Sequence, residues 1–462
     1  MDVMVIQACD QFHGTRWKRL LRGRHSIQER FLLEINSQDT IMASALKRPG
    51  SPFEPQSKHT RSPMKYVLVV GGSVSGLGKG ITASSIAVLL KASSWNVTML
   101  KIDPYLNMDA GTMSPYEHGE TFTLDDGGET DLDLGNYERF LDVRLTRDNN
   151  ITTGKIYQNV INAERAGKYL GKTVQVIPHI SNEIINWIER TALVPVSANG
   201  SENDFCVIEL GGTVGDIESM PFIEALRQLQ YKVGHENFVT TLVTYVPILG
   251  GSSEQKTKPT QNTVKDLRAA GLFPSVVCCR CSSPIEDSTR RKLAMFCQVQ
   301  PECIMSLHDI PNIHGVPLLL NQQGITQALA SHLGMYVSKS GPNIQKWSDI
   351  VHAIENPTAS VTIAVCGKYT EGTDTYLSVI RALQHAAASL KLKLDIAWVD
   401  SEQLEDAKQG SVECVRQRDT AVLQWLQTLL TLFACTKRIG ISFALAMAFS
   451  CPEALVPVES MV

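Results

Sequence analysis

The chain has 462 residues, of which 43% are hydrophobic and 19% are charged, and its formal net charge is −4. This length predicts two or three domains of roughly 150 residues each. The near-neutral charge excludes a general affinity for nucleic acids or anionic membranes, so an anionic ligand would have to be bound by a local cluster of cations. The 11 cysteines follow no secretory signal and form no paired CxxC motif, which predicts reduced thiols in a cytoplasmic protein and no zinc site.

Two stretches lie outside the expected folded core. Residues 1–63 end in a tract rich in proline and serine that has no apolar period, so we expect a disordered extension and linker. Acidic residues in this stretch argue against a mitochondrial presequence. Near the other end, the apolar tract 421–435 is interrupted by polar residues and is too short to span a bilayer, so no transmembrane helix is expected.

From Lys65 onward, short apolar runs typical of strands alternate with helix-compatible segments such as 81–92. This alternation predicts an α/β domain over residues 64–335, with a parallel sheet wrapped by helices. Ligands of such folds bind at the carboxyl ends of the strands, and polar clusters follow the apolar runs here. The predicted strands are 66–70, 97–102, 174–177, 205–210, 241–246, 275–279 and 303–307.

A second alternation follows a linker or short connecting helix at 336–359. It predicts the start of an incomplete second α/β domain over 360–407, and residues 408–462 form a divergent tail. The predicted elements are a strand at 360–369, a helix at 375–390 and a strand at 394–399.

The stretch VLVVGGSVSGLGKGITASS, residues 67–85, reads as a strand, a glycine-rich turn with one lysine, and the start of a helix. Lys79 and the amides at the helix start are typical of a phosphate-binding loop, and a tight turn that binds nothing is the alternative. The spacing departs from a standard P-loop, because Ser73 replaces its first glycine and Gly80 replaces the hydroxyl that holds magnesium. Magnesium would therefore need other ligands.

Two acidic residues could supply these ligands. Glu209 lies in the apolar run 205–210, so its carboxylate is expected at the carboxyl end of a strand. Asp133 lies in the acidic stretch DDGGETDLDLGNYERF, which could also be a solvated loop. Together with oxygens of ATP, the two carboxylates could complete an octahedral magnesium site.

Lysines mark two further places. Lys101 lies at the end of the apolar run 97–102, and Lys256 and Lys258 stand on a proline-containing loop that leads into a helix. Any of them could be an ordinary surface lysine. Two cations with helix-start amides, and with the side chains of Thr260 and Gln261 as donors, could nevertheless bind a triphosphate.

The motifs SGLGKG, KIDPYLNMDAGTMSPYEHGE, ETDLDLGNYERF, VIELGGTVGDIESMPF, EQKTKPTQN and MFCQVQPE occur in this order, as in CTP synthases. The chain resembles that family over a complete synthetase domain and over the first part of the glutaminase domain. The resemblance implies a P-loop-like α/β fold, ATP as co-substrate and Mg²⁺ as cofactor. It also implies that the 4-carbonyl oxygen of UTP is phosphorylated before ammonia displaces the phosphate to give CTP.

The resemblance implies a role for each residue that matches a family motif. Lys79 and Lys101 would be catalytic, and Asp133 and Glu209 would bind Mg²⁺. ATP would be bound by Gly76, Leu77, Gly78, Lys79, Gly80, Ile81, Asp133, His308, Asp309 and Ile310. UTP or CTP would be bound by Ser75, Asp216, Ile217, Glu218, Lys256, Thr257, Lys258, Pro259, Thr260, Gln261 and Lys292.

Departures from the family are mild in the synthetase part, at Gly76, at Ser253, where glycine is usual, and at His314, where tyrosine is usual. The other part departs strongly. The family makes ammonia with a cysteine nucleophile in a G-x-C-x-G turn and with a histidine that activates the thiol, but no histidine follows His385 here and no such turn is present. We therefore expect CTP synthesis from free ammonia, without glutamine hydrolysis.

The resemblance also implies partners. These are UTP, ATP, ammonia and CTP, a homotetramer or a mixed assembly with full-length CTP synthase, and neither nucleic acid nor membrane. The alternative function is that of a catalytically impaired, truncated paralogue that co-assembles with the full-length enzyme or regulates it.

Overall fold

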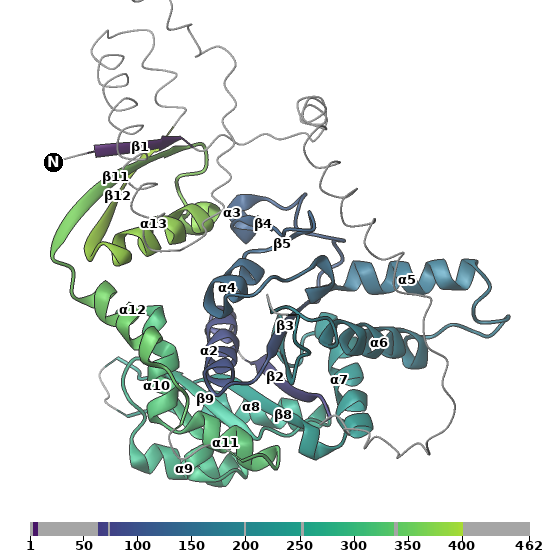
Figure 1. The fold of residues 1–462 in the computed structure, drawn as a ribbon. Coiled ribbons are helices and arrows are strands. Elements are labelled where there is room, and N and C mark those ends of the chain that lie inside the picture. The colour runs from purple at the N-terminus through teal and green to yellow at the C-terminus, as the bar shows by residue number, and fades with distance from the viewer. Residues whose placement is uncertain are drawn as a thin grey trace, which may run out of the picture. The chain divides into compact units, whose positions relative to one another are not determined.

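The computed structural model describes residues 63–72, 74–197, 200–250, 254–336 and 341–400, together with the backbone of strand β1, Val3–Gln7. The largest sheet has seven parallel strands in the order β10-β9-β8-β2-β7-β3-β6 (Figure 1). These strands are β2 (Lys65–Gly71), β3 (Val97–Asp103), β6 (Asn150–Thr152), β7 (Phe205–Leu210), β8 (Phe238–Tyr245), β9 (Val276–Cys281) and β10 (Ile304–His308).

Strand β2 shows why the sheet is buried on both faces. Its side chains alternate, with Leu68 and Val70 in a core on one face and Val67 and Val69 in a core on the other. None of the four is exposed to solvent. A strand that is covered on both faces has a continuous apolar sequence, as this one does, and the predicted parallel α/β fold is confirmed.

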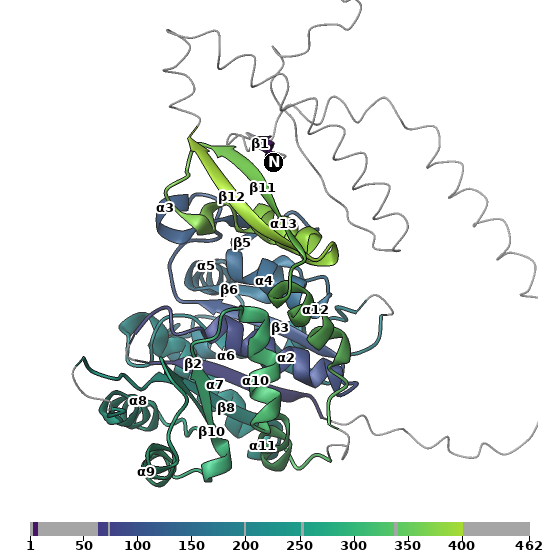
Figure 2. The ribbon, with the colours of Figure 1, turned by 90° about the vertical axis from the view of Figure 1, so that its left-hand side faces the viewer.

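Helices lie against both faces of the sheet (Figure 2). Side chains from the first group of helices form one core with the strands, and this group consists of α2 (Lys79–Ala92), α4 (Leu132–Leu141), α10 (Val316–Gln322) and α11 (Ile325–His332). The second group consists of α5 (Thr153–Arg165), α6 (Ser181–Ala192), α7 (Met220–Val233), α8 (Lys258–Ala269) and α9 (Asp287–Cys297). Among the helices that the structure describes, none is both long and apolar enough to cross a membrane.

The predicted strands are confirmed with one error, and one strand of the large sheet was not predicted. Residues 174–177 do not form a strand, since the short helical segment Val176–Ile180 begins within them and Val176 and Ile177 are about half exposed. The four residues VQVI, three of them apolar, fit a helix as well as a strand, so periodicity alone cannot decide. Strand β6 escapes prediction because its three residues, NIT, include a single apolar side chain.

Short elements connect the sheet to α4. They are α3 (Pro115–His118) and the antiparallel hairpin of β4 (Thr121–Thr123) and β5 (Glu129–Asp131). Helix α4 starts directly after β5, and the Asp131 side chain caps it by accepting a hydrogen bond from the Leu132 amide at 2.7 Å. The hairpin therefore fixes where α4 begins.

The last described part of the chain contains α12 (Gln345–Glu355), β11 (Ala359–Gly367), α13 (Leu377–Ser389) and β12 (Leu392–Asp400). This confirms the predicted connecting helix and the order strand, helix, strand. A smaller sheet has the order β1-β11-β12, and its strand β1 is not predicted from the sequence. Residues Ser62–Ala364 and Tyr369–Ala397 belong to one compact unit. The domain boundaries stay predictions, and most of the extension and the whole tail 408–462 lie outside the described residues.

Lys65 ties together the two ends of the part that carries the large sheet. This first residue of β2 donates hydrogen bonds from Nζ to the Leu333 carbonyl at 3.1 Å and to Asn237 Oδ1 at 2.8 Å. Leu333 directly follows α11. The first strand of the sheet is thus fastened to the end of its last covering helix.

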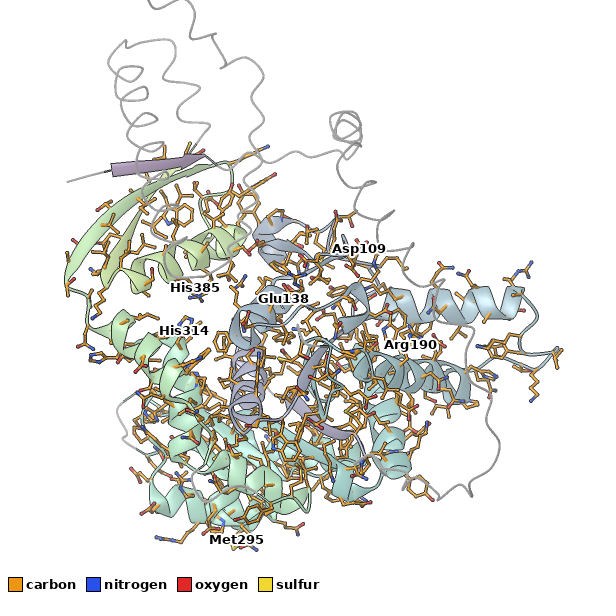
Figure 3. The ribbon with its side chains drawn as sticks, in the orientation of Figure 1. Asp109, Glu138, Arg190, Met295, His314 and His385 are labelled. Atoms are coloured by element: carbon orange, nitrogen blue, oxygen red, sulfur yellow. The ribbon has the colours of Figure 1, made fainter. Side chains whose placement is uncertain are left out.

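His314 lies in an aromatic cluster that joins three helices, and Figure 3 labels His314 and one of its neighbours, His385. Its ring stacks on Phe140 of α4, with centroids 5.5 Å apart, and lies 5.9 Å from Trp347 of α12 and 6.0 Å from His385 of α13. Burial lowers the pKa of His314 to about 4, and the nearby His385, Arg381 and Arg139 act in the same direction. His314 is therefore neutral at physiological pH.

Candidate active site

The turn between β2 and α2 has a backbone that requires glycine. Gly76 has φ 73° and Gly78 has φ 89°, both in the left-handed region that other residues rarely adopt. Helix α2 then begins at Lys79, so its first amides face the turn. This is the geometry of an anion-binding helix start, and the glycine at position 76 has a conformational reason.

Lys79 reaches from α2 across the end of β7. Its Nζ donates a hydrogen bond to the Gly212 carbonyl at 2.8 Å. Burial lowers the pKa of Lys79, while Glu209 raises it, and Lys101 adds to the lowering. Asp133 and Asp216 are also near enough to raise this pKa. The lysine of the loop therefore faces the residues that the sequence predicts as magnesium ligands.

Lys101 lies at the centre of a buried cluster of charges. The register of β3 and β7 sets Lys101 beside Glu209, and its Nζ lies 3.4 Å from Glu209 Oε1 and contacts Asp133 Oδ2 closely. Asp103, two residues along β3, is 3.7 Å away. Burial acts to lower the pKa of Lys101, but the three carboxylates outweigh it and raise the pKa well above its usual range. Lys101 is thus a permanent cation here.

The two predicted magnesium ligands converge above Gly80. A Cβ atom at this glycine would lie 2.9 Å from Asp133 Oδ1 and 3.3 Å from Glu209 Oε2. Gly80 is the position at which a standard P-loop has its magnesium-binding hydroxyl. Because Gly80 has no side chain, the carboxylates of Asp133 and Glu209 can occupy the space beside it. Their position is compatible with the predicted magnesium role.

Among the described residues, the centre offers two predicted metal ligands, Asp133 and Glu209, and no larger set of them. In the described part of the chain, no group of three or more His, Cys, Asp or Glu side chains is arranged to hold a metal ion. Mg²⁺ takes six oxygen ligands and commonly keeps those from water and substrate phosphates. A pair of carboxylates beside the glycine-rich turn is consistent with the prediction of an ion that arrives with a nucleotide.

The predicted UTP segment begins α8. Thr257 and Thr260 are buried, and Gln261 Nε2 donates to Thr257 Oγ1 at 3.1 Å. Lys256 pairs with Glu254 at 2.5 Å. A hydrogen bond from Lys256 lowers the pKa of Glu254, and Lys292 of α9 adds to the effect, so the two lysines lie in one neighbourhood. Lys258 and Lys292 are exposed.

The other predicted nucleotide segments lie at further strand ends. Asp216 accepts a hydrogen bond from the Thr213 amide at 3.1 Å, and Ile217 and Glu218 after it are exposed. His308 is the last residue of β10 and residues 309–310 follow it, and β10 lies three places from β2 in the sheet. Arg280 of β9 pairs with Asp309 and donates to the Leu307 carbonyl at 3.1 Å, and so fastens this segment.

Three residues of the charged centre escape the sequence prediction. Tyr137 donates a hydrogen bond to Glu209 Oε2, and burial together with Glu209 raises the pKa of Tyr137 well above its usual range, so the hydroxyl stays protonated. Burial raises the pKa of Asp131 to about 7. Asp103 accepts a hydrogen bond from Asn150 Nδ2 at 2.8 Å. A signal for two of them exists, since Asp103 is two residues from Lys101 on a strand and Tyr137 is four residues from Asp133 on a helix.

A sequence model described as the CTP synthase N-terminus matches residues 65–335 of the chain, which include the charged centre, the glycine-rich turn before α2 and the loop of Lys256 and Lys258. This chain belongs to the CTP synthase family. The match ends two residues after Leu333, where the part carrying the large sheet ends.

Curated CTP synthases are similar over most of this chain. CTP synthase 1-A of Xenopus laevis and CTP synthase 1 of Homo sapiens are each 55% identical over 343 residues, which cover 74% of this chain and 58% of the relative. The CTP synthase of Dictyostelium discoideum is 52% identical over 364 residues, covering 76% of this chain and 64% of the relative. The chain thus spans 58% of the length of the frog and human CTP synthases.

Proposed function

We propose that the chain is an ATP-dependent ligase that aminates UTP to CTP. The observation that carries the proposal is the convergence of Lys79, Lys101, Asp133 and Glu209 at the carboxyl ends of β2, β3 and β7. The 4-oxygen of UTP would attack the γ-phosphorus of ATP, and ADP would leave. Ammonia would then attack C4, and the oxygen would leave with the phosphate while the new amine loses a proton. Without the first step, the carbonyl oxygen is too poor a leaving group.

In this proposal one set of residues binds ATP and another set binds UTP or CTP. Lys79 binds the phosphates of ATP, and Lys101 stabilises the charge that develops on the transferred phosphoryl group. Asp133 and Glu209 hold Mg²⁺, which neutralises phosphate charge when bound. ATP is bound by residues 76–81 and 308–310. UTP is bound by Ser75, residues 256–261 and Lys292, and residues 216–218 recognise CTP.

Two observations support ammonia as the nitrogen source for this chain. No histidine follows His385 in its sequence, and none of Cys414, Cys435 and Cys451 lies in a G-x-C-x-G turn. A thiol that hydrolyses glutamine needs a base beside it and an oxyanion hole. The subunit arrangement in this proposal is a tetramer, or a mixed assembly with full-length CTP synthase.

The test is CTP formation from UTP, ATP and an ammonium salt by the purified chain. We expect turnover that falls at least a hundredfold when Lys79 is replaced by Ala, because the lysine stabilises charge in the transition state. Equal rates for wild type and Lys79→Ala would reject the assignment. A folded wild-type chain without turnover would favour the alternative, a paralogue that acts through assembly with the full-length enzyme.

A further inference from the structure

Tyr137 is a buried polar residue beneath the charged centre. It lies in the middle of α4, and its side chain has no exposed surface. Its ring packs in the core between the sheet and α2, among residues such as Leu134 and Ile86. Its hydroxyl donates to Glu209 Oε2, which is the hydroxyl's one hydrogen-bond acceptor among the described residues.

Glu209 is held by a different group at each carboxylate oxygen. Tyr137 donates to Oε2, and Lys101 lies 3.4 Å from Oε1. The terminal torsion of a glutamate is broad and nearly two-fold, so the backbone of β7 does not fix the plane of this carboxylate. Two donors from α4 and β3 do fix it.

Helix α4 serves both candidate metal ligands. Asp133 is in its first turn, and Tyr137 follows four residues later on the same face of the helix. One rigid element therefore presents the first carboxylate directly and orients the second through a hydrogen bond. The distance between the two carboxylates is set by the position of this helix relative to β7.

We propose that Tyr137 is a positioning residue that orients the Glu209 carboxylate for binding a divalent cation together with Asp133, an inference that rests on the proposed function for the role of the cation. Donors that orient metal-binding carboxylates commonly change metal affinity or activity by about 10- to 100-fold when they are removed. If Tyr137 only filled space in the core, removal of its oxygen would leave cation binding unchanged.

The experiment measures binding of Mn²⁺ to the purified full chain by electron paramagnetic resonance, with a non-hydrolysable ATP analogue present. Tyr137→Phe removes the donor and keeps the ring. We expect its Mn²⁺ affinity to fall about 10-fold or more. The control is Tyr66→Phe, which makes the same change at a buried tyrosine near the amino end of β2, away from the centre, and should leave the affinity within twofold of wild type.

Two further variants separate orientation from packing. In a Glu209→Gln background, Tyr137→Phe should have little additional effect, because the carboxylate that it orients is gone. Placing 3-fluorotyrosine at position 137 keeps both ring and donor and should retain wild-type affinity, which also tests the proposal if Tyr137→Phe does not fold. Wild-type Mn²⁺ affinity in folded Tyr137→Phe, or a tenfold loss with 3-fluorotyrosine, would overturn the inference.

The outcome is independent of whether CTP is made. If Mn²⁺ binding depends on Asp133, Glu209 and Tyr137 but no CTP forms, the inference holds and the proposed function fails. If CTP forms and Tyr137→Phe binds Mn²⁺ like wild type, the function holds and the inference fails.

Discussion

The side chain of Lys101 is nearly fully buried, and it is the cation common to Asp103, Asp133 and Glu209. Taking a lysine and three carboxylates out of water is costly, and only their mutual attraction offsets the cost. The contacts of Lys101 with these carboxylates would therefore contribute both to the stability of the fold and to the proposed reaction. A residue whose loss stops the reaction here should also destabilise the protein.

Replacing Lys101 by Ala should lower the free energy of unfolding by about 3–5 kcal/mol, because buried carboxylates are left without their cation. Urea unfolding followed by circular dichroism measures the change. The matched control is Lys232→Ala, which removes an exposed pair with Glu189 at 2.7 Å and should cost less than about 1 kcal/mol. A cost for Lys101→Ala no larger than that of the control would show that the cluster is hydrated.

Replacing Gly80 by Ser restores the hydroxyl of a standard P-loop, yet it should reduce CTP formation more than tenfold. The new Cβ would lie 2.9 Å from Asp133 Oδ1 and push the carboxylate away from Lys101. Steady-state rates with ammonium measure the effect, and Ala92→Ser, which adds the same hydroxyl at the last residue of α2, serves as the control. A Gly80→Ser variant as active as wild type would mean that the carboxylates do not need this space.

Among the elements, α4 has two contrasting faces. Its first turn and Tyr137 reach the charged centre, whereas Arg139 donates to Ser378 Oγ of α13 at 3.2 Å and Phe140 stacks on His314. The Ser378 amide also donates to Glu120 Oε2 at 2.6 Å. The helix that shapes the centre therefore also contacts α13.

Low pH should destabilise the folded chain through His314. The pKa of this histidine is about 4 in the folded chain and about 6.5 when unfolded, so the unfolded chain binds more protons between these values and stability falls as the pH drops from 6.5 to 4. We expect a loss of up to about 3 kcal/mol over this range. Thermal unfolding at several pH values measures it. A His314→Tyr variant should lose less stability over the same range, and an equal loss in both proteins would contradict this origin.

The loop before α8 allows a test of which residues bind UTP and which bind ATP. Lys256→Ala should raise the KM for UTP about tenfold or more and change the KM for ATP little, because this cation is assigned to the UTP triphosphate. Kinetics with each nucleotide varied in turn give the two constants. Lys265→Ala lies later on α8 and is the control. Similar increases in both constants would reject the division.

Elements with long apolar runs were predictable from the sequence, and the contacts between them were not. The run at β7 places Glu209 at a strand end because burial on both faces demands a continuous apolar sequence. The pairing of Lys101 with Glu209 depends on the order and register of β3 and β7, which no local pattern encodes. Asp131 was missed for the same reason, and the spacing of Tyr137 from Asp133 indicates a shared helix face but not the contact of Tyr137 with Glu209.

For the whole molecule, the family match covers residues 65–335, and the described residues after it include α12, β11, α13 and β12. We expect no glutamate release above background when the purified chain is incubated with glutamine, since a thiolate with its base and oxyanion hole is not available in this sequence. An enzyme-coupled glutamate assay measures it, with a full-length CTP synthase as the positive control. Release that is abolished by Cys414→Ser, Cys435→Ser or Cys451→Ser would contradict the prediction.

The hydrogen bond from Lys65 to Leu333 has a consequence for how this chain can be rearranged. The bond holds Leu333 within reach of the Lys65 side chain, so the two ends of the part that carries the large sheet are near each other. Units with adjacent ends tolerate circular permutation and insertion into other proteins. We therefore expect that the segments before residue 65 and after residue 333 can be replaced without moving the side chains of the charged centre.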